Sequence, residues 1–168
     1  SGRDDVALVL RGGSPDELSS AFSREEVSVI LSAPGIVRDT GGPIASPEFY
    51  TIVDLPMRST GTGANVPFRG VTARAVGVRE DFRIIAGRMF ERGKDEVVVG
   101  RGVFAQFGNV DLGQEVKWGS HTWRVVGVFE AGGSVSESEV WTDLSVLQGV
   151  YRRGNSVQVV RAQLLAPD

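Results

Sequence analysis

Residues 123–141 read WRVVGVFEAGGSVSESEVW, and this stretch decides which fold class the chain can adopt. Its first seven residues are dominated by Trp, Val and Phe, which favour a β-strand. A Gly/Ser/Glu loop follows, and Val140 with Trp141 then starts a second short strand. Two strands joined by a polar loop predict a β-rich unit with a core of its own. The side chains that we expect to be buried in it are Val125, Val126, Val128 and Trp141.

The flanking sequence extends this unit in both directions. Residues 114–118 and 122–129 surround a Gly119-Ser120 turn and alternate apolar with polar side chains, which predicts an antiparallel hairpin. Downstream, Asp143 is placed to cap a helix. A strand and a short helix are expected upstream, directly after a charged connector. Residues 91–154 are therefore predicted to form a small β-rich lobe.

The rest of the chain predicts a second lobe that contains a helix. Ser23 and Glu26 have the spacing of a capping box, and the helix that they open follows an N-terminal strand. Residues 44–57 and 66–71 are extended in pattern and can pair as a long hairpin. The fold class is thus α+β, a strand–helix–strand lobe into which a β-rich lobe is inserted. The expected bounds are residues 1–90, completed by 155–168, for the first lobe and 91–154 for the insertion.

Composition excludes several classes of function. The 168 residues are 41% hydrophobic and 23% charged, which is typical of a globular domain. The net charge of −3 offers no basic surface to nucleic acid, and the absence of cysteine excludes disulfides and thiol chemistry. No apolar run approaches the ~20 residues that span a bilayer, and no signal peptide is evident. We expect a soluble segment with no cofactor, no metal ion and no nucleic-acid partner.

Asp39-Thr40-Gly41 is the motif closest to a catalytic one. In aspartic proteases an Asp-Thr-Gly loop holds one carboxylate opposite another, and the two share a proton. Here Arg38 precedes the triplet and Gly42-Pro43 follows it, where a buried strand and a small residue are required. An ordinary turn, in which Asp and Gly are favoured, is the interpretation that we prefer.

The sequence gives weaker support to two other sites, a Ser–His dyad at His121 and a phosphate-binding loop at Gly61 and Gly63. His121 is the only histidine and adjoins Ser120, but neighbours on a strand point to opposite faces, which disfavours a Ser–His dyad. We expect a solvent-exposed turn histidine instead. Gly61 and Gly63 lack the third glycine of a dinucleotide fingerprint, so the sequence shows no phosphate-binding loop.

The acidic loop and the tryptophans are the remaining candidates. Glu130, Glu137 and Glu139 surround a Gly-Gly pair but lack the regular spacing of a calcium site. A solvated loop is favoured, with Glu139 placed to pair with Arg124. Aromatic residues at alternating strand positions are more typical of a core than of a sugar platform. We expect this of Trp118, Trp123 and Trp141.

Several segments, taken in order, resemble one known family. Each of them contains a glycine. The segments are VPFRGV (66–71), FRIIAGRMF (82–90), DEVVVG (95–100) followed by Phe104 and Phe107-Gly108, LGQ (112–114) and WRVVGVF (123–129). Their order and spacing resemble the MacB-like periplasmic core domain of FtsX/MacB-type ABC-transporter permeases, most clearly over residues 66–153.

The resemblance implies a porter-like lobe (1–90 and 155–168) and an inserted, smaller Sabre-like lobe (91–154). It places the domain outside the bacterial cytoplasmic membrane, between the first and second transmembrane helices of a permease. It implies a non-catalytic domain that couples ATP hydrolysis, by a separate cytoplasmic subunit or domain, to a periplasmic adaptor or cargo. It supplies no catalytic, metal-binding or cofactor-binding residues. A further helix and strand are expected after Asp168.

The partner-binding residues are not indicated by the resemblance. Exposed apolar side chains are the natural candidates, and we consider Phe49, Tyr50 and residues 55–57. Two other functions stay open at this point. One is a stand-alone periplasmic hydrolase of the aspartic type built on Asp39, and the other is a secreted ligand-binding module whose pocket is lined by the tryptophans.

Overall fold

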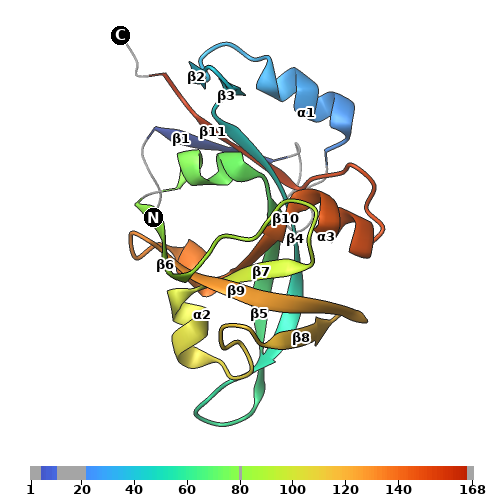
Figure 1. Cartoon of the computed structure of the whole chain (residues 1–168). Helices are drawn as coiled ribbons and strands as arrows, with labels where there is room; N and C mark the ends of the chain where they lie inside the picture. Colours follow the sequence, from blue (N-terminus) through green and yellow to red (C-terminus); the bar gives the residue numbers. More distant parts are fainter. Residues whose placement is uncertain (1–4, 11–21, 80, 166–168) are drawn as a thin grey trace.

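The computed structural model describes residues 5–10, 22–79 and 81–165, and within them one large mixed sheet organises the molecule (Figure 1). Its strands follow the order β1-β11-β4-β5-β10-β7-β9-β6, and β8 pairs with β9 off this path. Most neighbours are antiparallel, but β10 runs parallel to β5 and β9 runs parallel to β7. This mixed sheet with a few short helices confirms the α+β class.

The strands and helices have the following bounds. The strands are β1 (Val6–Val9), β2 (Arg38–Asp39), β3 (Gly42–Pro43), β4 (Ala45–Pro56), β5 (Gly63–Val71), β6 (Phe82–Gly87), β7 (Glu96–Gly100), β8 (Glu115–Trp118), β9 (His121–Ala131), β10 (Val140–Asp143) and β11 (Val159–Gln163). The helices are α1 (Arg24–Leu31), α2 (Arg101–Gln106) and α3 (Leu144–Val150), with the 3-10 helices η1 (Ala73–Val78) and η2 (Val135–Ser138).

As predicted, capping residues in the sequence mark where helices α1 and α3 begin. Ser23 and Glu26 form a complete capping box at the start of α1, each side chain accepting the other residue's backbone N–H. Asp143 caps α3 by accepting the backbone N–H of Val146 at 3.2 Å. The predicted hairpins are present as β4–β5 and β8–β9.

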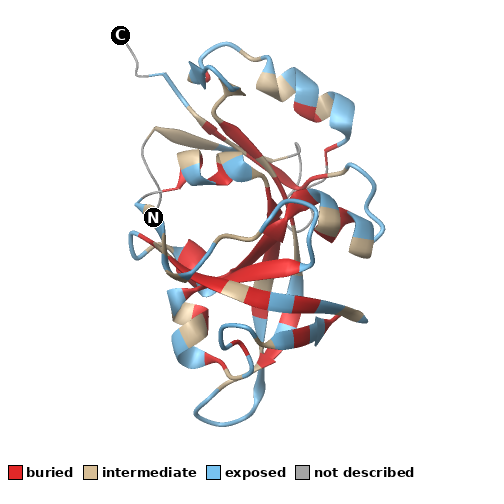
Figure 2. Cartoon of the chain, viewed as in Figure 1, coloured by how far each residue is buried: buried red, intermediate tan, exposed pale blue. Residues whose placement is uncertain are grey.

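One face of the sheet carries the main apolar core. Phe68 of β5 packs edge-on against Trp118 and Trp123, with ring centroids 5.1 and 5.0 Å apart. Helix α3 packs closely on this face. A Cβ added to Gly70 would be 3.0 Å from the Cα of Leu144 and 3.1 Å from the Cβ of Leu147. Figure 2 shows β10 and β7, at the centre of the sheet, buried along their whole length.

The opposite face carries a smaller aromatic cluster, formed by Phe82, Phe129 and Trp141. Phe82 stacks on Trp141 at 5.2 Å and on Phe129 at 5.1 Å, measured between ring centroids. Helix η1 lies on this face, where Ala75 packs with Val71 and Trp141. Of the four side chains predicted to be buried around residues 123–141, Val126 alone remains partly exposed.

The sheet is continuous across the predicted boundary between the two lobes. β1, β11 and β4 lie at one end of the sheet, and β7, β9 and β8 lie at the other. β6 falls within residues 1–90 but pairs with β9 at the far edge. β5 and β10 join the two groups in parallel, with Val71 opposite Asp143. Among the described residues, no helix is long and apolar enough to cross a membrane.

Candidate coupling site: a buried arginine–glutamate cluster

Glu48 of β4 lies at the centre of a buried group of charges on the η1 face of the sheet. Its side chain has no solvent exposure. Arg79, directly after η1, donates two hydrogen bonds to the two carboxylate oxygens at 2.8 and 2.9 Å. Arg69 adds a third at 3.1 Å and Arg161 of β11 a fourth at 3.2 Å, while the hydroxyl of Ser46 donates at 2.8 Å. Both oxygens of this carboxylate thus accept hydrogen bonds from at least two donors.

Arg69 of β5 extends the group into the next part of the sheet. Its Nε and Nη2 donate to the carboxylate of Glu139 at 3.0 and 2.8 Å, which is the two-point geometry that suits a guanidinium. The indole N–H of Trp141 donates to the same carboxylate at 2.9 Å. One buried guanidinium therefore joins two glutamates that lie on opposite sides of β5.

We name this group the charged cluster. Its members are joined by mutual hydrogen bonds and all but the partly exposed Arg161 are buried; they are Ser46, Glu48, Arg69, Arg79, Ser136, Glu139, Trp141 and Arg161. They come from β4, β5, β10 and β11, from η2, and from the residues directly after η1 and directly before β10. Four consecutive strands of the sheet, β11, β4, β5 and β10, therefore meet in one network.

Electrostatics keep Glu48 ionised inside this network. Burial alone would raise the pKa of its carboxyl, because a charge is disfavoured away from water. The charges of Arg79, Arg69 and Arg161 and the hydrogen bonds from Arg79 outweigh that penalty and lower the pKa of Glu48 to about 2. The carboxylate is consequently a fixed charge at any physiological pH and cannot exchange protons as a catalytic acid would.

This arrangement of the charged cluster is suited to holding its residues in place rather than to catalysing a reaction. A buried charge that loses its partner costs several kcal/mol, so each member of the network holds the others in one arrangement. The rings of Tyr50 and Trp141 pack beneath Arg69 and Arg79, with guanidinium-to-centroid distances of 4.8 and 4.9 Å. The charged cluster therefore links β4, β5, β10 and β11 through side-chain contacts as well as through backbone pairing.

The acidic loop differs from the sequence prediction. Glu139 does not pair with Arg124, because it is buried on Arg69, and Arg124 pairs with Glu115 at 3.0 Å. Glu137 is also buried rather than solvated. The prediction failed because η2 folds the loop back over the end of the sheet, as its backbone hydrogen bonds show.

Glu137 and Glu130 are held by arginine and by backbone N–H groups. Glu137 accepts from Arg101 at 2.7 Å and from the N–H groups of Ala131 and Gly133 at 2.8 and 2.9 Å. Burial opposes these contacts, yet together they lower the pKa of Glu137. Glu130 pairs with Arg83 and Arg101. Among the described residues, no group of three acidic or histidine side chains is arranged to hold a metal ion.

Asp39 lies on a short exposed ribbon, β2–β3, as the turn interpretation predicts. Its carboxylate accepts the N–H of Gly41 at 2.8 Å and pairs at two points with Arg74, at 2.6 and 2.7 Å. Hydrogen bonds from Arg74 and Gly41 lower the pKa of Asp39 to about 2. A carboxylate fixed in this way cannot share a proton with a twin, so the geometry of an aspartic protease is lacking.

His121 is half-exposed at the first residue of β9. Its Nε2 lies 2.8 Å from Asp95 Oδ1, and its ring packs edge-on against Trp123 at 4.7 Å. No hydrogen bond joins it to Ser120 within the described part of the chain. The histidine therefore belongs to a surface contact rather than to a Ser–His dyad.

The tryptophans are core residues, as predicted, with exposed fractions of 7%, 1% and 0% for Trp118, Trp123 and Trp141. The proposed docking residues were wrong in part. Phe49 and Leu55 are only 3% and 2% exposed, because both side chains pack in the main core. Tyr50 lies partly buried beneath Arg69. Pro56 and Met57 keep partial exposure at the end of the β4–β5 hairpin.

Sequence reasoning missed the charged cluster altogether. A signal for it exists, since Arg69 and Arg161 are the single charges of β5 and β11, and Glu48 is one of two charges in β4. Each occupies a strand position whose side chain points away from the main core, where a solvent-facing residue is expected. Only the fold shows that this second face is covered and that the three charges converge.

Comparisons with known proteins bear on the family. A model of the MacB-like periplasmic core domain matches residues 2–165. The fold resembles the periplasmic region of MacB from Actinobacillus actinomycetemcomitans, with a TM-score of 0.69 and 14% identity over 98% of this chain and 77% of that one. It also resembles the extracellular domain of the ABC-type transporter YknZ from Gram-positive bacteria, with a TM-score of 0.63 and 18% identity over 88% and 75% of the two chains.

A search of curated protein sequences finds no significant match. The structural likenesses establish the fold, and the family match spans nearly the whole chain. The chain therefore belongs to the MacB-like periplasmic core domain family and is a periplasmic domain of an ABC-transporter permease.

Proposed function

We propose that this domain is a non-catalytic coupling element. The transporter context implies an ATPase in the same complex. In our proposal that ATPase is a cytoplasmic subunit or domain, the permease lies in the bacterial cytoplasmic membrane, and the present domain passes the conformational change to a periplasmic adaptor or cargo. The work required of the domain is mechanical, so it needs stiffness and an exposed surface rather than an acid–base pair.

The observation that supports this proposal is the bridge made by Arg69. Its guanidinium binds Glu48 at 3.1 Å and Glu139 at 2.8 Å, and both ion pairs are almost completely buried. Glu48 is in turn bound to Arg79 and Arg161, at the other end of the sheet from β7 and β9. A push on β11 therefore reaches β10 through charged groups that cannot separate without a large energetic cost.

We keep two lobes in this proposal, a porter-like one over residues 1–90 and 155–168 and a Sabre-like one over 91–154. The grouping of β1, β11 and β4 at one end of the sheet and of β7, β8 and β9 at the other supports the division. β6 joins the second group by its pairing with β9. In this arrangement the lobes move as one body.

A crosslink between the lobes tests the proposal in the complete transporter. Met57, at the end of the β4–β5 hairpin, forms an isolated antiparallel bridge with Phe107, directly after α2. Paired residues of this kind have Cα atoms about 5 Å apart, which suits a disulfide. This domain has no cysteine, so Met57→Cys with Phe107→Cys introduces one defined pair.

If the domain transmits motion as one body, oxidation of this pair leaves ATP-driven transport at the rate of the reduced protein. The reduced double variant is the matched control, because it carries the same substitutions without the crosslink. If oxidation stops transport and a reducing agent restores it, the lobes must hinge against each other, and rigid coupling is wrong. Neither Asp39 nor the buried tryptophans supports a second function.

A further inference from the structure

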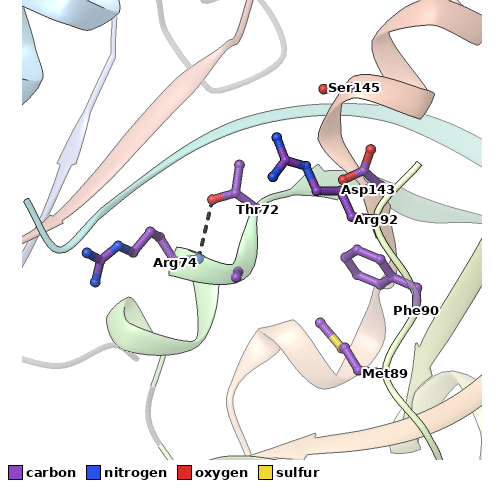
Figure 3. Close-up of a pocket in the computed structure, with 8 residues that line it drawn as sticks. Thr72, Arg74, Met89, Phe90, Arg92, Asp143 and Ser145 are labelled. Carbon is purple, nitrogen blue, oxygen red and sulfur yellow. Dashed lines mark hydrogen bonds between the residues drawn. The ribbon is translucent and has the colours of Figure 1, made fainter. Parts of the chain in front are cut away.

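A cavity of about 380 Å³ opens where β5 and β10 end. Three segments line it: the start of η1, the connector between β6 and β7, and the start of α3 (Figure 3). The coupling role proposed above makes no use of this cavity. Its lining residues are Thr72, Ala73, Arg74, Met89, Phe90, Arg92, Asp143 and Ser145.

The topology of the sheet explains why a cavity forms here. β5 and β10 are parallel neighbours, and Val71 lies opposite Asp143 at their carboxyl ends. After β5 the chain turns to one face, where η1 packs on the aromatic cluster, and after β10 it turns to the other face, where α3 packs over Gly70. When two parallel neighbouring strands end at the same edge and the chain turns to opposite faces after them, a crevice forms between the two connections. Open α/β sheets bind ligands at such points.

The cavity contains one positive and one negative side chain that are free of ion pairs. Arg92 is exposed, and within the described part of the chain it forms no ion pair. Asp143 is 6% exposed, and its only hydrogen bond there uses Oδ2, which accepts from Val146. Arg74 differs from both, because its guanidinium is bound to Asp39 and points away from the other labelled side chains in Figure 3.

The remaining lining is partly apolar. Met89 and Phe90 are half-buried and pack against the aromatic cluster, so their outer surfaces form an apolar wall. The hydroxyls of Thr72 and Ser145 are the other polar groups. A volume of this size corresponds to roughly a dozen water molecules, and hence to a ligand of about a dozen non-hydrogen atoms.

We propose that this cavity binds a free amino acid with an apolar side chain. The carboxylate of the ligand pairs with Arg92, its ammonium group pairs with Asp143, and its side chain lies on Met89 and Phe90. A zwitterion satisfies both charges at once, whereas a simple anion would be repelled by Asp143 and a simple cation by Arg92. The proposal is independent of the coupling role, since the crosslink between Met57 and Phe107 does not involve this cavity.

L-phenylalanine is the first probe, titrated into the 168-residue chain and followed by NMR chemical shifts. A ligand of about a dozen atoms at ordinary efficiency is expected to bind with a dissociation constant of about 1 mM. N-acetyl-L-phenylalanine lacks the ammonium group and L-phenylalaninamide lacks the carboxylate. Each is expected to bind at least about tenfold more weakly, which corresponds to the loss of one charge-assisted contact.

Two variants test the assigned contacts. Asp143→Asn removes the charge but keeps the helix cap, because Asn caps as well as Asp, and it should weaken binding of L-phenylalanine without weakening binding of the N-acetyl derivative. Arg92→Gln should weaken binding of L-phenylalanine without weakening binding of L-phenylalaninamide. Arg124→Gln, on the exposed side of β9, is the matched control and should bind like the wild type.

Three results would overturn the proposal. One is the absence of saturable shifts at about 10 mM L-phenylalanine, well above the expected dissociation constant. Another is equal binding of L-phenylalanine and its two derivatives. The third is unchanged binding in both Asp143→Asn and Arg92→Gln.

Discussion

On one face of the sheet Phe68 packs edge-on against Trp118 and Trp123, whereas on the other face Glu48 is enclosed by arginines. Both regions are fully buried, and both draw residues from strands far apart in the sequence. Apolar packing tolerates an exchange of one side chain for another of similar volume. A buried ionic network does not, because each charge must keep a partner at a fixed distance and angle.

This difference separates two roles within one sheet. The apolar face supplies most of the buried surface and hence the general stability. The charged face adds directional contacts that allow one arrangement of the strands. A domain that transmits motion, as proposed above, benefits from the second property, since buried ionic contacts are costly to break.

The largest expected effect comes from removing the central charge. Glu48→Gln keeps the shape of the side chain but leaves the buried guanidinium groups of Arg79 and Arg69 with too little negative charge nearby. We expect a loss of about 3–5 kcal/mol in the free energy of unfolding, measured by urea denaturation. Glu115→Gln, in the exposed pair with Arg124, is the matched control and should cost well under about 1 kcal/mol. A similar small loss for both variants would show that the charged face is not special.

Acid should weaken the charged face in a defined range. The pKa of Glu48 is lowered from the ordinary value of 4.5 to about 2 in the folded state. Its contribution to stability is therefore complete above pH 4.5 and is lost as the pH falls towards 2, amounting to about 3 kcal/mol. The measurement is the free energy of unfolding against pH for wild type and Glu48→Gln.

The two pH curves should converge at the acid end. Other carboxylates with a lowered pKa, namely Asp39, Glu96 and Glu137, still give the variant some acid sensitivity. The difference between the curves isolates Glu48. A difference that stays constant from pH 6 to pH 2 would contradict an ionised Glu48 with a pKa of about 2.

A smaller effect is expected on the apolar face. Leu147 of α3 is fully buried against β5, and Leu147→Met conserves volume and polarity. We expect a cost below about 1.5 kcal/mol in the free energy of unfolding. A loss as large as that of Glu48→Gln would remove the contrast between the two faces.

The smallest effect is expected at the surface pair of Asp39 and Arg74. Asp39→Asn keeps the hydrogen bond to Gly41 and removes only an exposed ion pair, which contributes little in water. The thermal midpoint should stay close to that of wild type, as measured by circular dichroism. A large drop would mean that the β2–β3 ribbon has a structural role comparable to that of the charged cluster.

The sequence predicted those features that depend on neighbours along the chain. The capping box at Ser23, the cap at Asp143 and the β4–β5 hairpin all rest on spacings of a few residues, and the structure contains each of them. The burial of the tryptophans followed from strand alternation in the same way. Local geometry dictates these features, so a single sequence is enough to find them.

The charged cluster depends on distant neighbours and could not be predicted. Glu48 meets Arg79 across 31 positions and Arg161 across 113, and Arg69 meets Glu139 across 70. A charge on an alternating strand ordinarily indicates a solvent-facing side. The exposure considered for Phe49 was wrong for a related reason, because the fold and not the local sequence places this side chain in the main core.

Native-state hydrogen exchange of wild type and Glu48→Gln tests the central claim most directly. If the charged cluster joins β11, β4, β5 and β10 into one body, the amides of β11 and β10 should lose protection by the same factor in the variant. Protection lost in β11 and β4 alone, with β10 and β7 exchanging as in wild type, would contradict the account.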